Sequence, residues 1–128
     1  MDVLLRILLV SPDLMATSRI AALGRDCQAS VETLRSLEAA VPVPQGPFDL
    51  VLVDLQALPG DAAVIVARTR AALDKTAARP AGPPKLVAFG PHVARQRLDD
   101  AVAAGADDAV SRGELLGAFP ALLRRWCR

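Results

Sequence analysis

The sequence has few of the side chains that most metal and nucleophile sites require. Its two cysteines, Cys27 and Cys127, stand far apart, and His92 is its one histidine. No CxxC pair or other metal-ligand spacing occurs, so the simplest expectation is two free thiols in a reducing compartment. No serine or cysteine is placed to be activated by His92, which favours a structural or idle role for it.

Nucleotide motifs and charge runs are missing as well. Neither GxGxxG nor GxxxxGK[ST] is present, so a small enzyme with a nucleotide or flavin pocket remains a remote alternative. The formal net charge is +1 with no long run of one sign, and we expect neither nucleic acid nor membrane as a partner. Residues 1–10 are apolar but too short to span a bilayer, and they lack a basic head and a cleavage site. We interpret them as the start of a cytoplasmic protein.

The chain does contain a strongly apolar stretch that ends in one acid. Four apolar residues, 50–53, lead directly to Asp54, and 52% of the 128 residues are hydrophobic. A strand with one exposed face would alternate apolar and polar residues, so this pattern predicts a central strand covered on both faces. In an open α/β sheet, sites collect beyond the carboxyl ends of the strands. We therefore predict a single domain, residues 1–128, with Asp54 at its site.

Strands and helices alternate along the rest of the chain. The predicted strands cover residues 4–10, 27–31, 48–54, 85–89 and 106–111. The predicted helices cover residues 11–23, 32–40, 61–77, 93–104 and 115–126, with Ser11-Pro12-Asp13 as the first helix start and Gly24 as its stop. This order favours parallel strand pairs with right-handed crossovers. Pro120 would cost about 3 kcal/mol inside a regular helix, so the last helix must kink there or begin near Gly117.

Three stretches carry a resemblance to a known family. They are residues 6–10 (RILLV), residues 48–54 (FDLVLVD) and residues 103–108 (AAGADD). In this order and spacing they resemble the receiver domain of bacterial response regulators, over nearly the whole chain. The resemblance implies a flavodoxin-like, doubly wound parallel sheet of strand order 2-1-3-4-5. It also implies five helices, with the first and fifth on one face and the other three on the opposite face.

The resemblance also implies a phosphorylation site, from which this sequence departs. Phosphoryl transfer to a carboxylate needs Mg²⁺ held by acids, a cation for the phosphoryl oxygens and a hydroxyl that grips the product. The acceptor position is kept as Asp54. The family's acidic pair falls on Ser11 and Pro12, with Asp13 one place later. The hydroxyl position falls on Gly90 and the invariant lysine on Arg112.

These departures favour a degenerate receiver, or pseudo-receiver. We expect a protein-binding domain in bacterial signalling that is not an enzyme and carries no cofactor. The alternative is a phosphorylatable receiver that uses Asp54 as acceptor, in which case Asp13 and Asp54 would be the candidate ligands of Mg²⁺. An ion pair between Asp54 and Arg112 is a further structural possibility.

The partner surface is also suggested by the resemblance, which places it on the fourth helix, fifth strand and last helix. Here Arg95, Arg97 and Asp99 should point outward, because Leu98 and Val102 take the inner face. The last helix carries more apolar residues than one stripe needs, so we expect some of them to be exposed, with Leu123 and Trp126 as the interface candidates. Self-association into a homodimer is the simplest form, and other signalling proteins are the expected partners. The alternative is that Pro120 kinks the helix and both halves bury their apolar faces.

Overall fold

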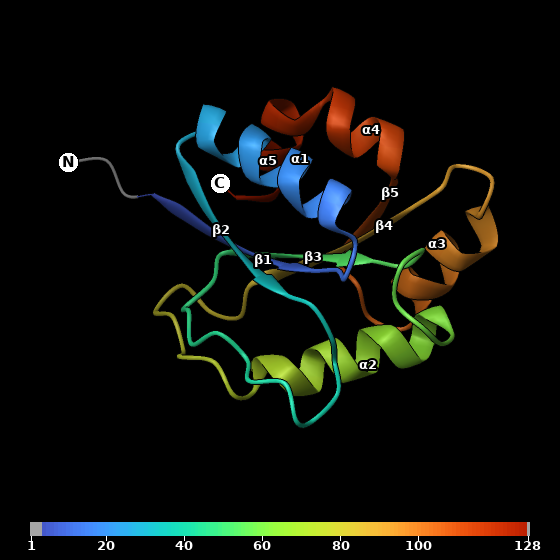
Figure 1. Ribbon diagram of the computed structural model, residues 1–128, viewed down its shortest axis with the longest axis horizontal. Coiled ribbons are helices and arrows are strands. Elements are labelled where there is room, and N and C mark those ends of the chain that lie inside the picture. The colour runs from blue at the N-terminus through green and yellow to red at the C-terminus, as the bar shows by residue number, and fades with distance from the viewer. Residues whose placement is uncertain (1–3, 128) are drawn as a thin grey trace.

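The computed structural model describes residues 4–127 as one sheet covered by helices on both faces (Figure 1). Five parallel strands follow the order β2-β1-β3-β4-β5, as predicted. The strands are β1 (Leu5–Val10), β2 (Ala29–Leu34), β3 (Leu50–Asp54), β4 (Lys85–Gly90) and β5 (Asp108–Ser111). The helices are α1 (Leu14–Asp26), α2 (Ala62–Leu73), α3 (Arg95–Ala103), α4 (Arg112–Gly117) and α5 (Phe119–Trp126). Among these described residues, no helix combines the length and apolarity needed to cross a bilayer.

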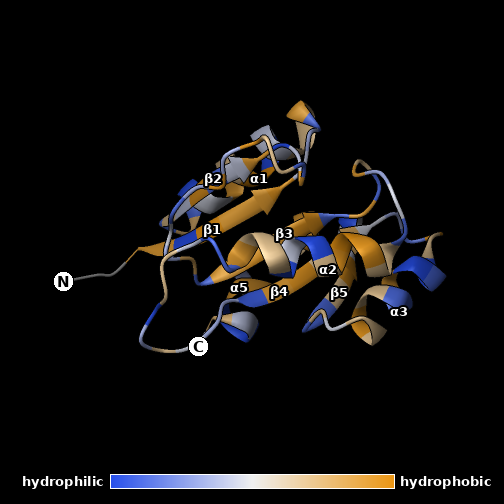
Figure 2. Cartoon of the chain, turned by 90° about the horizontal axis from the view of Figure 1, so that it is seen from below, coloured by the Kyte–Doolittle hydropathy of each residue, from blue (hydrophilic) through white to orange (hydrophobic). Residues whose placement is uncertain are grey.

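The strand that ends in Asp54 is the centre of the fold, as its sequence predicts. All five residues of β3 are buried, and β3 pairs with β1 on one side and β4 on the other. Side chains of β3 alternate between two cores, one under α1, α4 and α5 and one under α2 and α3. Seen from below, the central strands are almost uniformly hydrophobic (Figure 2). An unbroken apolar run is therefore explained by burial on both faces.

The helix predicted over residues 32–40 is absent, and that prediction is wrong. Strand β2 continues to Leu34, because its six residues pair in register with the six residues of β1. The chain then runs as a loop from Arg35 to Asp49 and passes beneath α2 (Figure 1). Because residues 32–34 belong to the strand, too few residues remain before Pro42 for an independently stable helix. The helix count still matches, because the C-terminal stretch forms two helices.

We expected Gly24 to end the first helix, but it lies inside α1. A Cβ atom at this position would lie 2.6 Å from Cγ2 of Val31 on β2. The helix continues to Asp26, and the residue with positive φ that follows it is Gln28, at 58°. Glycine is therefore explained by the close approach of α1 to the sheet.

The C-terminal segment breaks near Pro120, as predicted. Helix α4 ends at Gly117, and α5 begins at Phe119 with the proline in its first turn, where its missing N–H is not needed. Both halves bury their apolar faces against the sheet. On the opposite face, Leu98 and Ala101 of α3 are buried, whereas Val102 is 47% exposed and does not take the inner position we expected.

Candidate functional site

The site residues gather where the carboxyl ends of β1, β3 and β4 meet. Asp54 is the last residue of β3, Ser11 follows β1 and Gly90 ends β4. In a parallel sheet these strand ends share one edge, which is where α/β proteins place their sites. Asp54 and Ser11 are both buried, with exposed fractions of 1% and 0%. The site is therefore closed over by the protein's own side chains.

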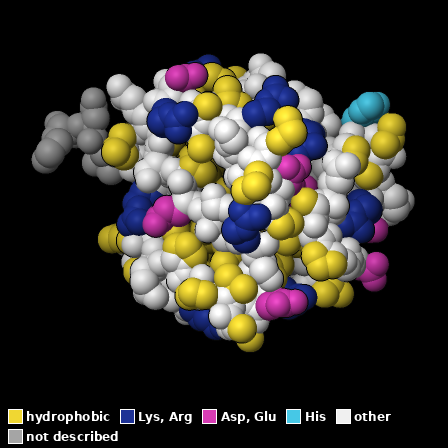
Figure 3. Space-filling model, viewed as in Figure 1, with side chains coloured by type: hydrophobic (Ala, Val, Ile, Leu, Met, Phe, Trp, Pro, Cys, Tyr) yellow, Lys and Arg dark blue, Asp and Glu magenta, His cyan; other side chains and the backbone are white. Residues whose placement is uncertain are grey.

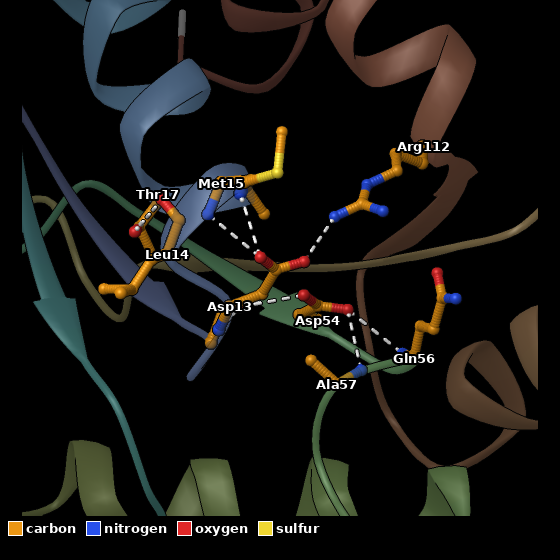
Figure 4. A network of polar contacts seen from close by, with 10 residues as sticks. Asp13, Leu14, Met15, Thr17, Asp54, Gln56, Ala57 and Arg112 are labelled. Atoms are coloured by element: carbon orange, nitrogen blue, oxygen red, sulfur yellow. Dashed lines mark hydrogen bonds and ion pairs between the residues drawn. The ribbon is translucent and has the colours of Figure 1, made fainter.

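The Asp54 carboxylate has a hydrogen-bond donor on each oxygen (Figure 4). Its Oδ1 accepts the backbone N–H groups of Gln56 and Ala57 at 3.0 and 3.1 Å. Its Oδ2 accepts the hydroxyl of Ser11 at 2.8 Å. A carboxylate buried without a nearby cation needs such donors to offset the loss of water. Among the described residues, only neutral groups donate hydrogen bonds to this buried acid.

Ser11 lies in the site beside Asp54 and does not cap the first helix. We predicted it as the cap of the first helix, but that helix starts at Leu14 and its N-cap is Asp13. The Ser11 hydroxyl donates to Asp54 and accepts the backbone N–H of Asp13 at 3.1 Å. Ser11 therefore connects the central strand to the entry of α1. Pro12, between them, accepts a hydrogen bond from the Arg35 guanidinium through its carbonyl oxygen at 3.1 Å.

Asp13 is fully engaged in capping and in an ion pair. Its Oδ1 accepts the N–H groups of Met15 and Ala16, and its Oδ2 lies 3.0 Å from Nη2 of Arg112. The hydrogen bond from the Arg112 side chain, followed by the bond from the Ala16 N–H, holds the pKa of Asp13 below its usual value. Arg112 thus pairs with Asp13, and the ion pair we considered between Arg112 and Asp54 is not formed.

The residues present do not fit a magnesium site. No group of three or more acidic, histidine or cysteine side chains suited to a metal ion occurs within residues 4–127. Mg²⁺ needs several oxygen ligands in near-octahedral geometry. The oxygens of Asp54 already accept three hydrogen bonds, and those of Asp13 serve the helix cap and Arg112.

Gly90 supplies no hydroxyl to the site because glycine has no side chain, although the surrounding atoms leave space for a Cβ atom. It is buried at the end of β4, and a Cβ atom there would meet Leu55 and Leu98 at ordinary contact distances of 3.7 and 3.8 Å. There is therefore room for a Cβ atom at this position. The backbone beside it is fixed, because Leu55 donates its N–H to the carbonyl oxygen of Phe89 at 2.9 Å.

Arg97 is a site residue that the sequence did not reveal. We expected it to point outward from α3, but its guanidinium donates to the carbonyl oxygens of Leu55 at 2.6 Å and Gly60 at 3.3 Å. It therefore holds both ends of the loop that follows Asp54. Helical periodicity places Arg97 beside the buried Leu98, at the flank of the apolar face, and a long side chain there can reach the neighbouring loop.

The expected partner surface is only in part a free surface. Arg95 and Asp99 are exposed on α3. Leu123 and Trp126 are buried, with exposed fractions of 3% and 6%, so the exposed apolar strip expected on the last helix is absent. The Trp126 indole N–H donates to Asp108 of β5 at 3.0 Å, which ties this ring to the core. The alternative, in which the break at Pro120 lets both halves bury their faces, describes this segment.

Comparisons with known proteins identify the fold. No protein-family model matches the sequence, and no curated protein matches it significantly. The chemotaxis response regulator CheY4 of Vibrio cholerae matches with a TM-score of 0.69 and 15% identity, over 96% of this chain and 98% of that chain. The chain thus has the flavodoxin-like fold of the response-regulator receiver domain, as its sequence motifs predict.

Two further structures support the same fold. One match comes from the co-crystal structure of a Saccharomyces cerevisiae histidine phosphotransfer protein and the receiver domain of its response regulator. It has a TM-score of 0.74 and 17% identity, over 97% of this chain and 89% of that one. The receiver domain of a Pseudomonas aeruginosa sensor histidine kinase has a TM-score of 0.71 and 18% identity, over 98% of both chains. That protein coordinates a magnesium ion in its active-site cleft.

Proposed function

We propose that this chain is a pseudo-receiver, a signalling domain that acts by binding other proteins and does not use phosphorylation. The proposal rests above all on the state of the Asp54 carboxylate, which is buried and bonded to Ser11 and two backbone N–H groups. A phosphoacceptor must present an oxygen to the phosphoryl donor beside a metal ion. Here that oxygen is covered, and Ser11 and Pro12 stand where acids would be needed.

We propose that the domain is not an enzyme and uses no cofactor, because its most buried acid serves as a structural hydrogen-bond acceptor. Bacterial, cytoplasmic signalling or regulatory proteins are the proposed partners, by analogy with the fold. Arg95 and Asp99, exposed on α3, remain candidates for such contacts, whereas the buried Leu123 and Trp126 no longer support a homodimer.

The deciding experiment treats the ¹⁵N-labelled full chain with Mg²⁺ and beryllofluoride, and separately with Mg²⁺ and acetyl phosphate. We expect the amide signals of residues 54–60 to stay in place, and intact-mass analysis to detect no phosphorylated protein. The Asp54→Asn variant, treated in the same way, reports changes that do not depend on the acid. A Mg²⁺-dependent shift in the wild-type chain that Asp54→Asn abolishes would overturn the proposal and establish the phosphorylatable receiver.

A further inference from the structure

The connection between β2 and β3 differs from the other connections in the sheet. Helices lie between β1 and β2, between β3 and β4, and between β4 and β5, but residues 35–49 pass from β2 to β3 without one. On the face of the sheet that α2 and α3 cover, the part next to β2 is therefore covered by a loop. Leu37, Val41 and Val43 of that loop pack against the core but are only partly buried. Within residues 4–127, no helix between β2 and β3 completes this layer.

A groove lies between this loop and α2. Its volume is about 230 Å³. Its apolar lining comes from the end of β2, the loop and the C-terminal half of α2: Leu34, Leu37, Val41, Val43, Ala71 and Ala72. The space-filling view shows hydrophobic, basic and acidic side chains side by side at the lower side of the molecule, where the loop crosses α2 (Figure 3). We call this feature the α2 groove.

The exposed side of α2 has the spacing of a helix-packing face. Val64, Arg68 and Ala71 follow at intervals of four and three residues, which places them on one stripe, and Lys75 lies in the turn that follows α2. Val64 is 48% exposed and extends the apolar surface beyond the groove. The small Ala71 on this stripe allows another helix to approach closely, because the side chains at the contact set the distance between helix axes.

The charge of the groove indicates the chemistry of its occupant. Arg68 and Lys75 both line it, against the single acid Glu38. Neither cation forms an ion pair within the described part of the chain, although Arg68 donates to the carbonyl oxygen of Leu37 at 3.1 Å. A second copy that packed the same stripe would bring like charges together. Acidic side chains on either side of an apolar stripe would instead pair with both cations.

We propose that the α2 groove receives an acidic, amphipathic α-helix of a partner protein, which fills the place of the missing crossover helix. The occupant binds with its apolar stripe on Ala71, Leu37 and Val43 and with acidic residues toward Arg68 and Lys75. The nature of this occupant rests on the proposed function as a protein-binding domain. The groove itself lies under α2, apart from the Asp54 site.

The test uses two designed 16-residue helical peptides with the same leucine stripe, one flanked by glutamates and one by lysines. Each is titrated into the ¹⁵N-labelled full chain without Mg²⁺ or phosphoryl donor. The glutamate peptide should shift the amide signals of residues 35–45 and 64–76 and bind at least tenfold more tightly than the lysine peptide. Lys75→Glu and Ala71→Trp, both at exposed positions, should each weaken binding at least tenfold. Ala63→Trp, an exposed change on the same helix outside the groove lining, should not.

Several results would overturn the inference. These are equal binding of both peptides, shifts elsewhere on the surface, or affinities that Lys75→Glu and Ala71→Trp leave unchanged. Self-association of the free chain that Ala71→Trp disrupts would assign the groove to a second copy. Binding to phosphatidylserine vesicles that Lys75→Glu abolishes, without peptide binding, would assign it to a lipid surface. If the glutamate peptide does not bind, only the proposed occupant of the groove is rejected. If Asp54 is phosphorylated in the presence of Mg²⁺, only the proposed function is rejected.

Discussion

Ser11 donates its hydroxyl hydrogen to Oδ2 of Asp54 across 2.8 Å, and both side chains are buried. Two residues 43 positions apart thus form one unit at the carboxyl edge of the sheet. The hydroxyl gives this buried carboxylate oxygen a hydrogen-bond donor. The unit therefore joins the end of β3 to the segment that follows β1.

Replacing Ser11 tests this unit directly. Ser11→Ala removes the donor to a buried carboxylate oxygen, and we expect a loss of about 1–3 kcal/mol in the free energy of unfolding. Asp54→Asn should recover part of that loss in the double variant, because a neutral amide costs less to bury. Urea denaturation of the four chains measures the coupling. Ser18→Ala, on the exposed side of α1, is the control, and equal stability of Ser11→Ala and wild type would contradict the structural role.

The pair between Asp13 and Arg112 should make stability depend on acid pH. Because the pKa of Asp13 in the folded chain lies below its ordinary value of 3.8, the folded state binds the proton more weakly than the unfolded state. The stabilisation is complete above that ordinary value and is lost as the pH falls through the lowered pKa. Asp13→Asn should flatten this acid decline in the melting temperature between about pH 5 and pH 2.

Arg112→Gln should flatten the same decline, since the Arg112 side chain is the largest cause of the lowered pKa. The double variant should behave like either single variant. Additive effects of the two substitutions would show that Asp13 and Arg112 act on stability separately.

Arg97 should rigidify the loop that follows Asp54. Arg97→Ala removes two charge-assisted hydrogen bonds, to the carbonyl oxygens of Leu55 and Gly60, and we expect a loss of about 1–2 kcal/mol. Hydrogen exchange of the amides of residues 55–60 should accelerate more than that of β1. Arg95→Ala, at an exposed position on the same helix, should change stability by less than about 0.5 kcal/mol. Unchanged exchange in the loop would remove Arg97 from the site.

Trp126 should behave as a core residue. Trp126→Ala leaves a cavity beneath α5 and removes the hydrogen bond to Asp108, so we expect a loss of about 3–5 kcal/mol. Sedimentation should give the same mass for wild type and for any Trp126→Ala chain that stays folded. Arg124→Ala, exposed on the same helix, is the matched control. A folded Trp126→Ala chain with native stability and a lower oligomeric mass would restore this residue to an interface.

The sequence by itself determined the layout of the fold. The apolar run 50–53 could only be a strand buried on both faces, because an exposed face would require polar residues at alternate positions. The alternation of strands and helices led to a parallel sheet, and Pro120 led to a break in the last helix. These predictions succeeded because periodicity and proline geometry act over a few neighbouring residues.

Only the tertiary structure decided which side chains meet. The pairs Ser11–Asp54 and Asp13–Arg112 join residues 43 and 99 positions apart, and their contacts depend on strand register and helix placement. Local patterns also misled us over residues 32–40, where pairing with β1 extends β2 and leaves a proline-rich loop in place of a helix. Burial of one face is encoded locally, but a hydrogen bond between distant strand ends exists only once the sheet has formed.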